Sequence, residues 1–136
     1  MVDLIFLNKL PEEKEYYGLY QSTGWDPEGR WTAEMLQESL INSWYILSVV
    51  KDGRLAASGR IVSDGVIQCI ICDVIVLPDF QGYGIGSMVM EHLISHCKAK
   101  GIRWIQLSAA SGKAEFYERF GFVRRAADAP GMSLFL

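Results

Sequence analysis

Hydrophobic residues recur along the chain with two different periods, and the change of period marks the expected elements. Three apolar stretches near the middle of the chain have the alternating or continuous pattern of strands. They are separated by Asp52-Gly53 and Asp64-Gly65, which favour hairpin turns because these residues tolerate a positive φ. The pattern therefore predicts three antiparallel strands at about 44–50, 54–62 and 66–77.

Helical spacing of apolar residues appears in the other long segments. Residues three and four positions apart form a wide apolar stripe over 84–100, which predicts a long buried helix. Shorter helices are expected over 11–22, after Thr32 and over 112–120. Thr32 and Ser111 are placed to cap the last two, since their hydroxyls can accept from the first free amides.

Short strands are expected at 3–7, at 102–107, from Phe122 and at 132–136. The element order is then β-α-α-β-β-β-α-β-α-β-β. The helix between strands 66–77 and 102–107 requires a parallel crossover. We predict a single α/β domain over residues 1–136, with a mixed, mostly antiparallel sheet of six to seven strands flanked by helices.

Composition excludes several classes of protein. Half of the 136 residues are hydrophobic and 21% are charged, so the chain is not disordered. The net charge of -3 gives no electrostatic reason to expect a nucleic-acid-binding protein, since such proteins usually have a basic face. No apolar run reaches the ~18 residues of a membrane span, and the N-terminus lacks the basic start of a signal peptide. With three cysteines, too few for a disulfide scaffold, we expect a cytoplasmic protein.

Two short spacings resemble metal-binding patterns without supporting a metal. Cys69 and Cys72 form a C-x-x-C pair, but residues three apart in a strand point to opposite faces. No second Cys or His pair follows at the spacing of a zinc finger. His92 and His96 lie one helical turn apart, but two ligands at this spacing do not by themselves make a metal site. We therefore predict packed thiols, surface histidines and no metal.

The chemistry-bearing candidate is the glycine-rich turn before the long helix, residues 81–87. Alternate glycines allow close approach of a ligand, and the helix start adds free N–H groups and a positive dipole end. The turn lacks the Lys of a Walker A loop, and the third glycine and ribose-binding acid of a dinucleotide fingerprint. It predicts a phosphate or pyrophosphate site, with a ligand-free tight turn as the alternative.

Two blocks of the sequence resemble the GCN5-related N-acetyltransferases. Residues 81–86, QGYGIG, follow a V-x-V strand and match that family's Gln/Arg-x-x-Gly-x-Gly/Ala signature. Residues 114–122, AEFYERFGF, resemble its helix with a Tyr before a Gly-Phe pair. The separation of the two blocks and the element order also agree. The resemblance implies the family's fold and acetyl-CoA as the acyl donor.

The resemblance also implies roles for individual residues. The V-x-V strand, here Val74 and Val76, would pair with the pantetheine arm, and a bulge near Val74 would offer its N–H to the thioester oxygen. Tyr117 would be the general acid that protonates the leaving thiolate. The pyrophosphate would lie on the turn, at Gln81, Gly82, Tyr83, Gly84, Gly86 and Ser87.

The general base is left open by the sequence. The positions where many family members carry Glu or His are occupied here by Cys72 and Ile70. The nearest carboxylate is Asp73, directly before Val74, which either deprotonates the amine or hydrogen-bonds the backbone at the bulge. An Asp in this place, and Gly131-Met132 near the end, resemble family members that acetylate arylalkylamines.

We therefore expect an enzyme that transfers an acetyl group to a primary amine of a small molecule. One alternative is a non-catalytic acyl-CoA-binding module, and another is a protein or peptide N-acetyltransferase. The resemblance also allows a homodimer. Aromatic residues of the first two helices and their loop either enclose the amine or pack against the sheet; they are Tyr16, Tyr17, Tyr20, Trp25 and Trp31.

Overall fold

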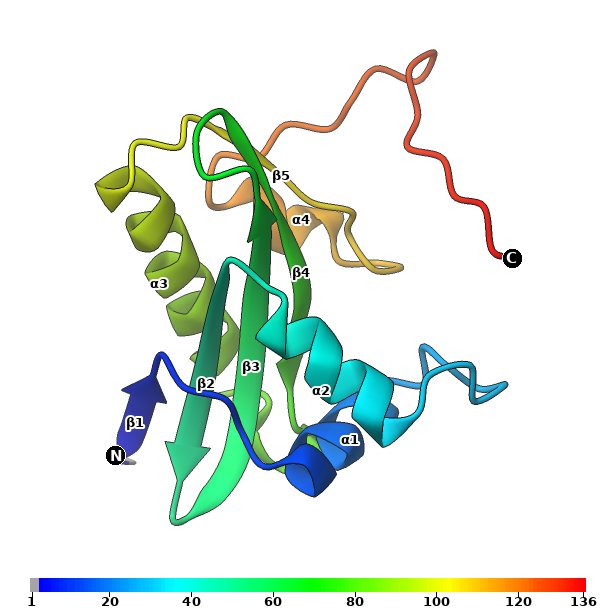
Figure 1. Ribbon diagram of the computed structural model, residues 1–136. Helices are drawn as coiled ribbons and strands as arrows, with labels where there is room; N and C mark the ends of the chain where they lie inside the picture. The colour runs from blue at the N-terminus through cyan, green and yellow to red at the C-terminus, as the bar shows by residue number, and fades with distance from the viewer. Residues whose placement is uncertain (1–2) are drawn as a thin grey trace.

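A five-stranded sheet forms the centre of the computed structural model, which describes residues 3–136 (Figure 1). The elements follow the predicted order as far as residue 118. They are β1 (Leu4–Leu7), α1 (Glu13–Gln21), α2 (Ala33–Ile41), β2 (Tyr45–Lys51), β3 (Arg54–Ser63), β4 (Gln68–Val76), the short 3-10 helix η1 (Pro78–Phe80), α3 (Ile85–Ala99), β5 (Trp104–Gln106) and α4 (Ala114–Glu118).

The strands lie in the sheet in the order of the sequence, β1-β2-β3-β4-β5. The first four are antiparallel, whereas β5 runs parallel to β4 after the long connection through α3. This confirms the predicted parallel crossover and the mostly antiparallel sheet. The β4–β5 pairing is short, because it extends only from Gln68–Trp104 to Ile70–Gln106.

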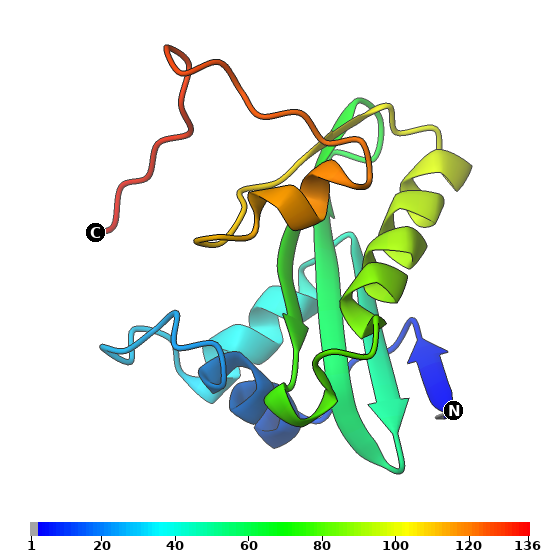
Figure 2. The same cartoon turned by 180° about the vertical axis from the view of Figure 1, so that it is seen from behind.

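Helices cover both faces of the sheet, as Figures 1 and 2 show from opposite sides. On one face α3 buries a continuous apolar stripe against β2, β3 and β4, including Val89, Leu93 and Cys97. On the other face α1 and α2 form a second core with the sheet, in which Tyr16 and Leu40 are buried. Burial of apolar surface on both sides stabilises the sheet as the middle layer.

The two predicted hairpin turns differ. Asp52 and Gly53 have φ of 51° and 75°, the left-handed pair expected of a two-residue turn. The connection between β3 and β4 is longer than a two-residue turn. Within it, Asp64 Oδ1 accepts hydrogen bonds from the amides of Val66 and Ile67 at 2.7 and 2.8 Å. β4 consequently begins at Gln68, two residues later than predicted.

Of the two predicted helix caps, one is correct and one is wrong. Thr32 Oγ1 accepts from Met35 N at 3.1 Å and caps α2, as predicted. Ser111 does not cap α4, because that helix starts later, with Lys113 at the cap position and no side-chain bond there. Residues 110–113 form a turn before the helix begins, closed by a hydrogen bond from Lys113 N to Ala110 O.

The last two predicted strands are absent, so the described residues form five strands rather than six or seven. After Gly121 the chain has neither helix nor strand and leads away from the sheet (Figures 1 and 2). Strands are stabilised by pairing, and this segment has no strand beside it here. No helix within residues 3–136 is long and apolar enough to cross a membrane.

Candidate active site

The centre of the candidate site is a bulge in β4. Ser58 pairs with Ile75 but Arg60 pairs with Cys72, so two residues of β4, Asp73 and Val74, lie opposite Gly59 alone. Asp73 has a φ of 51°, a left-handed conformation that is uncommon outside glycine and marks the extra residue of the bulge. The structure thus has a bulge where the sequence resemblance implied one.

Gly59 allows α3 to pack closely against this bulge. A Cβ at this position would lie 2.9 Å from Leu93 Cδ1 and 3.0 Å from Val89 Cγ1. Both of those α3 side chains are fully buried and have no free space to move into. The glycine therefore brings the helix that follows the glycine-rich turn directly onto the bulged strand.

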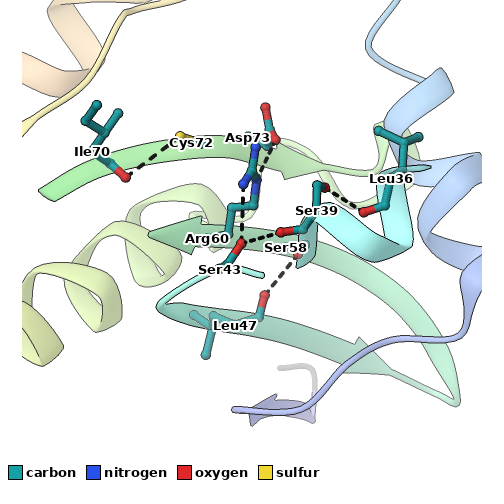
Figure 3. Close-up of polar contacts among 9 residues, drawn as sticks. All are labelled: Leu36, Ser39, Ser43, Leu47, Ser58, Arg60, Ile70, Cys72 and Asp73. Atoms are coloured by element: carbon teal, nitrogen blue, oxygen red, sulfur yellow. Dashed lines mark hydrogen bonds and ion pairs between the residues drawn. The ribbon is translucent and has the colours of Figure 1, made fainter. Parts of the chain in front are cut away.

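Asp73 is held by a side chain rather than by the backbone. Arg60 Nε donates to Asp73 Oδ2 at 2.9 Å, and both side chains are about four-fifths buried. Arg60 also donates to Ser43 Oγ at 3.3 Å, and Ser43 donates onward to Ser39 O at 2.7 Å (Figure 3). A line of hydrogen bonds therefore connects the bulge to the start of β2 and to α2.

A cavity of about 350 Å³ opens where β4 and β5 diverge. β5 pairs with β4 only as far as Ile70, so the rest of β4 has no strand neighbour on that side. Asp73, Val74 and Tyr117 all contribute to the cavity wall, together with Cys72. The structure thus brings the three predicted catalytic residues to one cavity, from two elements far apart in sequence.

Tyr117 reaches this cavity from α4. Its ring packs edge-on against Phe116 and Phe122, with centroids 5.0 and 6.4 Å away. Burial raises the pKa of Tyr117 above its ordinary value of 10.0, so the phenol stays protonated at neutral pH. A half-buried, protonated phenol in the cavity wall can donate a proton to a base that forms there.

The loop between α1 and α2 contributes Trp25 to the same cavity. The Asp26 carboxylate orders this loop by accepting the amides of Arg30 and Trp31, each at 2.9 Å. Tyr20 lies edge-on to Trp25, with ring centroids 5.8 Å apart. Of the other predicted aromatic residues, Tyr16 is fully buried beneath α1, so it packs the helix on the sheet.

The glycine-rich turn follows the other end of β4. Gly82 and Gly84 have φ of 87° and 78°, and a Cβ on either would meet no protein atom within 4 Å. The first helical hydrogen bond of α3 runs from Met88 N to Gly84 O at 3.2 Å, so the amides of residues 85–87 have no acceptor within the helix. The first turn of α3 carries no acidic residue, and the turn suits an anion.

Gln81, which the resemblance placed in the pyrophosphate site, makes two hydrogen bonds within the turn. Its side-chain Nε2 donates to Val76 O at 2.9 Å, and its amide donates to Pro78 O at 3.2 Å. Both groups are therefore used to brace the turn, and the amides open to an anion begin at Gly82. Tyr83 lies exposed beside them, with 66% of its surface accessible.

Reading the sequence missed Arg60 as the partner of Asp73 and missed Cys72 as part of the cavity wall. Arg60 was not singled out, although a charged residue inside an otherwise apolar strand is itself a signal of a specific partner. The C-x-x-C pair separates as predicted: Cys69 is buried 3.4 Å from Cys97 of α3, measured between sulfurs, whereas Cys72 lines the cavity. Within residues 3–136 no three His, Cys, Asp or Glu side chains gather as metal ligands.

Residues 12–122 match the acetyltransferase (GNAT) family. The chain is 29% identical over 147 aligned residues to the uncharacterized N-acetyltransferase ycf52 of Pyropia yezoensis, covering 95% of this chain and 84% of that protein. It is 36% identical over 83 residues to serotonin N-acetyltransferase 2, chloroplastic, of Oryza sativa subsp. japonica, covering 61% of this chain and 42% of the rice protein.

Solved structures agree with this assignment. A probable acetyltransferase of Staphylococcus aureus superposes with a TM-score of 0.86 and 26% sequence identity, covering 98% of this chain and 100% of that one. On the sequence match and the shared fold, this chain belongs to the acetyltransferase (GNAT) family.

Proposed function

We propose that this acetyltransferase moves the acetyl group of acetyl-CoA to a primary amine of a small molecule. The observation that carries the proposal is the meeting of Asp73, Val74 and Tyr117 at one cavity beside the open edge of β4. The same strand leads into the glycine-rich turn, so a donor lying along β4 would reach both places.

The residues present fit acetyl-CoA as the donor. Its pyrophosphate would accept from the amides of the turn, from Gly82 to Ser87, where positive φ angles and the start of α3 turn N–H groups outward. Its pantetheine arm would lie against Val74 and Val76, along the part of β4 that β5 leaves unpaired. An arm with amide groups pairs with such an edge as a strand does.

The chemical step is attack by a neutral amine nitrogen on the thioester carbonyl carbon. The carbonyl oxygen becomes an oxyanion, and the Val74 N–H at the bulge would stabilise it. The C–S bond then breaks, the thiolate takes the phenolic proton of Tyr117, and the extra proton of the amine passes to solvent. A thiol with a pKa near ~8.5 is a fair leaving group, so no metal is needed.

A small acceptor is favoured by the size and walls of the cavity. Its volume of about 350 Å³ and its Trp25 wall suit an amine attached to a ring or short chain. The rice relative is named as a serotonin N-acetyltransferase, which supports an arylalkylamine as the first substrate to test.

The proposal is tested by measuring CoA release from acetyl-CoA with a panel of small amines, polyamines and short peptides. Tyr117→Phe is expected to lower kcat by about 100-fold, because a general acid contributes at least that much. Tyr45→Phe is the matched control, since Tyr45 stacks on His96 away from the cavity.

Two outcomes would favour the alternatives. Tight binding of acetyl-CoA without turnover of any amine would indicate a non-catalytic acyl-CoA-binding module, which the engagement of Asp73 by Arg60 would also suit. Turnover of peptides alone would indicate a protein or peptide N-acetyltransferase.

A cytoplasmic location remains part of the proposal and is supported by the free thiols of Cys69, Cys72 and Cys97.

A further inference from the structure

The glycine-rich turn offers neutral amides to a phosphate but no cationic side chain of its own. Residues 77–90 contain no Lys or Arg, and their one charged side chain, Asp79, lies 3.4 Å from a guanidinium nitrogen of Arg54. The start of a helix contributes only about half of an elementary positive charge. The phosphates of CoA carry several negative charges, and the chain has a net charge of -3. A cation from another element would therefore strengthen donor binding.

The helix α4 packs an aromatic ring on the first turn of α3. A Cβ added to Gly86 would lie 3.5 Å from Phe116 Cζ and 3.7 Å from Val76 Cγ2. The Phe116 ring thus lies where the strand proposed to hold the pantetheine arm meets the helix that follows the turn. Figure 2 shows α3 and α4 on the same face of the sheet, where Phe116 packs against the core that α3 buries.

Arg119 places a positive charge on this ring. Its guanidinium carbon lies 5.0 Å from the centre of the Phe116 ring, which is a cation–π contact. A guanidinium that packs by its face keeps the N–H groups at its edge free for hydrogen bonds. Arg119 is exposed, and none of the ion pairs among residues 3–136 involves it. Arg124, by contrast, pairs with Glu118 at 3.1 Å.

We propose that Arg119 binds a phosphate group of the donor nucleotide beside the glycine-rich turn. The guanidinium supplies the positive charge that residues 77–90 lack, and Phe116 holds it near the amides of residues 85–87, which have no acceptor within the helix. A guanidinium also donates two parallel hydrogen bonds to phosphate, so the contact is directional as well as electrostatic. The inference rests on acetyl-CoA as the donor, which is part of the proposed function.

The consequence is that α4 and the residue that follows it contact both ends of the donor. Tyr117 lines the cavity where the thioester is expected, whereas Arg119, two residues later, would hold a phosphate. Binding of the nucleotide half would then fix the position of the general acid. A donor without phosphates would lose this link as well as the contacts of the turn.

Calorimetric titration of the full chain with CoA tests the proposal without any need for turnover. Arg119→Gln is expected to weaken CoA binding by about fivefold and to reduce its dependence on salt, because an ion pair with phosphate is lost. Arg103→Gln is the matched control, since Arg103 is also exposed but follows the other end of α3, roughly 20 Å from the turn. Circular dichroism establishes that both variants fold.

Two further titrations identify the group that is bound. Dephospho-CoA lacks the 3′-phosphate, so equal binding of it by Arg119→Gln and the wild type, beside the loss for CoA, assigns Arg119 to that group. A loss for both ligands assigns it to the pyrophosphate. Arg119→Lys keeps the charge without the planar, two-pronged contact and is expected to recover only part of the CoA affinity.

Two results would overturn the inference alone, because CoA binding itself would persist. One is equal binding of CoA by Arg119→Gln and the wild type at low and high salt. The other is a loss of the same size in Arg103→Gln, which would reflect net charge rather than a contact. If the wild-type chain does not bind CoA at all, the proposed donor fails and this inference fails with it.

Discussion

The Arg60 guanidinium holds the Asp73 carboxylate at the bulge of β4, with 2.9 Å between Nε and Oδ2. Burial lowers the pKa of Arg60, but the hydrogen bond and the charge of Asp73 outweigh it and leave the pKa above its ordinary value. The arginine is thus a permanent cation beside the carboxylate. The sequence offered two readings of Asp73, as a base or as a partner of the backbone, and the structure adds this third one.

Because Asp73 Oδ2 already accepts from Arg60, we expect Asp73 to orient the amine rather than deprotonate it. Asp73→Asn is then expected to lower kcat/KM by about tenfold, mainly by raising KM for the amine. Asparagine tolerates the left-handed backbone at this position, so the bulge should persist. The pH profile of kcat/KM is the deciding measurement. Loss of a limb from that profile in the variant would identify Asp73 as the base instead.

Arg60→Met is expected to destabilise the protein by about 2–4 kcal/mol, because it leaves a largely buried carboxylate without its partner. Adding Asp73→Asn to this variant removes the unpaired charge and should recover much of the loss. Urea unfolding of the two single variants and the double variant gives the coupling energy. Additive losses would mean that the two side chains do not stabilise each other.

Gly84→Ala is expected to weaken CoA binding by about tenfold, because alanine is strained by roughly 1–2 kcal/mol at a φ of 78° and the turn would shift. Gly101→Ala is the control, since Gly101 has the same φ, is equally open and lies beyond the other end of α3. Calorimetry with CoA should separate the two variants although their melting temperatures fall alike. Equal CoA binding by both would remove the glycine-rich turn from the donor site.

Gly59→Ala is expected to cost about 1–3 kcal/mol of stability, as overpacking in a dense core does. The added methyl group would meet Leu93 and Val89, which are fully buried. Gly18→Ala in α1 serves as the comparison, because its Cβ meets nothing and alanine favours a helix by about 0.5–1 kcal/mol. The midpoint of urea unfolding should fall for Gly59→Ala and rise for Gly18→Ala. An unchanged midpoint for Gly59→Ala would show that α3 can move away from the strand.

Stability is expected to fall as the pH drops below about 6.5, partly through His96. Its ring stacks on Tyr45 with centroids 3.7 Å apart, and burial, helped by Lys100, lowers its pKa from the ordinary 6.5. The folded state therefore binds fewer protons than the unfolded state in that range, so acid favours unfolding. His96→Gln should flatten this part of the profile of unfolding free energy against pH, and an unchanged slope would contradict the assignment.

Local features of the fold were predictable from the sequence. The turn at Asp52 and Gly53, the cap at Thr32 and the long helix before Gly101 each depend on residues close in the chain. The glycine-rich turn was found for the same reason, since its conformation is set by its own glycines.

Features that depend on pairing between distant segments were not predictable. The partnership of Arg60 and Asp73 depends on the bulge, which shifts the register between β3 and β4. Residues 132–136 have apolar residues at alternate positions as a strand does, but whether they form a strand depends on a sheet edge that these residues do not themselves supply. The hydrogen bond from the Gln81 side chain to the carbonyl of Val76 was not predictable, because that carbonyl lies within reach only after the chain has folded.

The close seating of α3 on Gly59 has a consequence for which donors the enzyme accepts. The helix that starts at the glycine-rich turn packs closely on the bulged strand that carries Val74, so we expect the two not to slide past one another. The distance between the two ends of the proposed donor site, the glycine-rich turn and Val74, is therefore fixed. This fixed distance would select donors by the length of their arm. An acyl carrier with a shorter or longer arm would fail to engage both ends at once, even if its headgroup and thioester were unchanged.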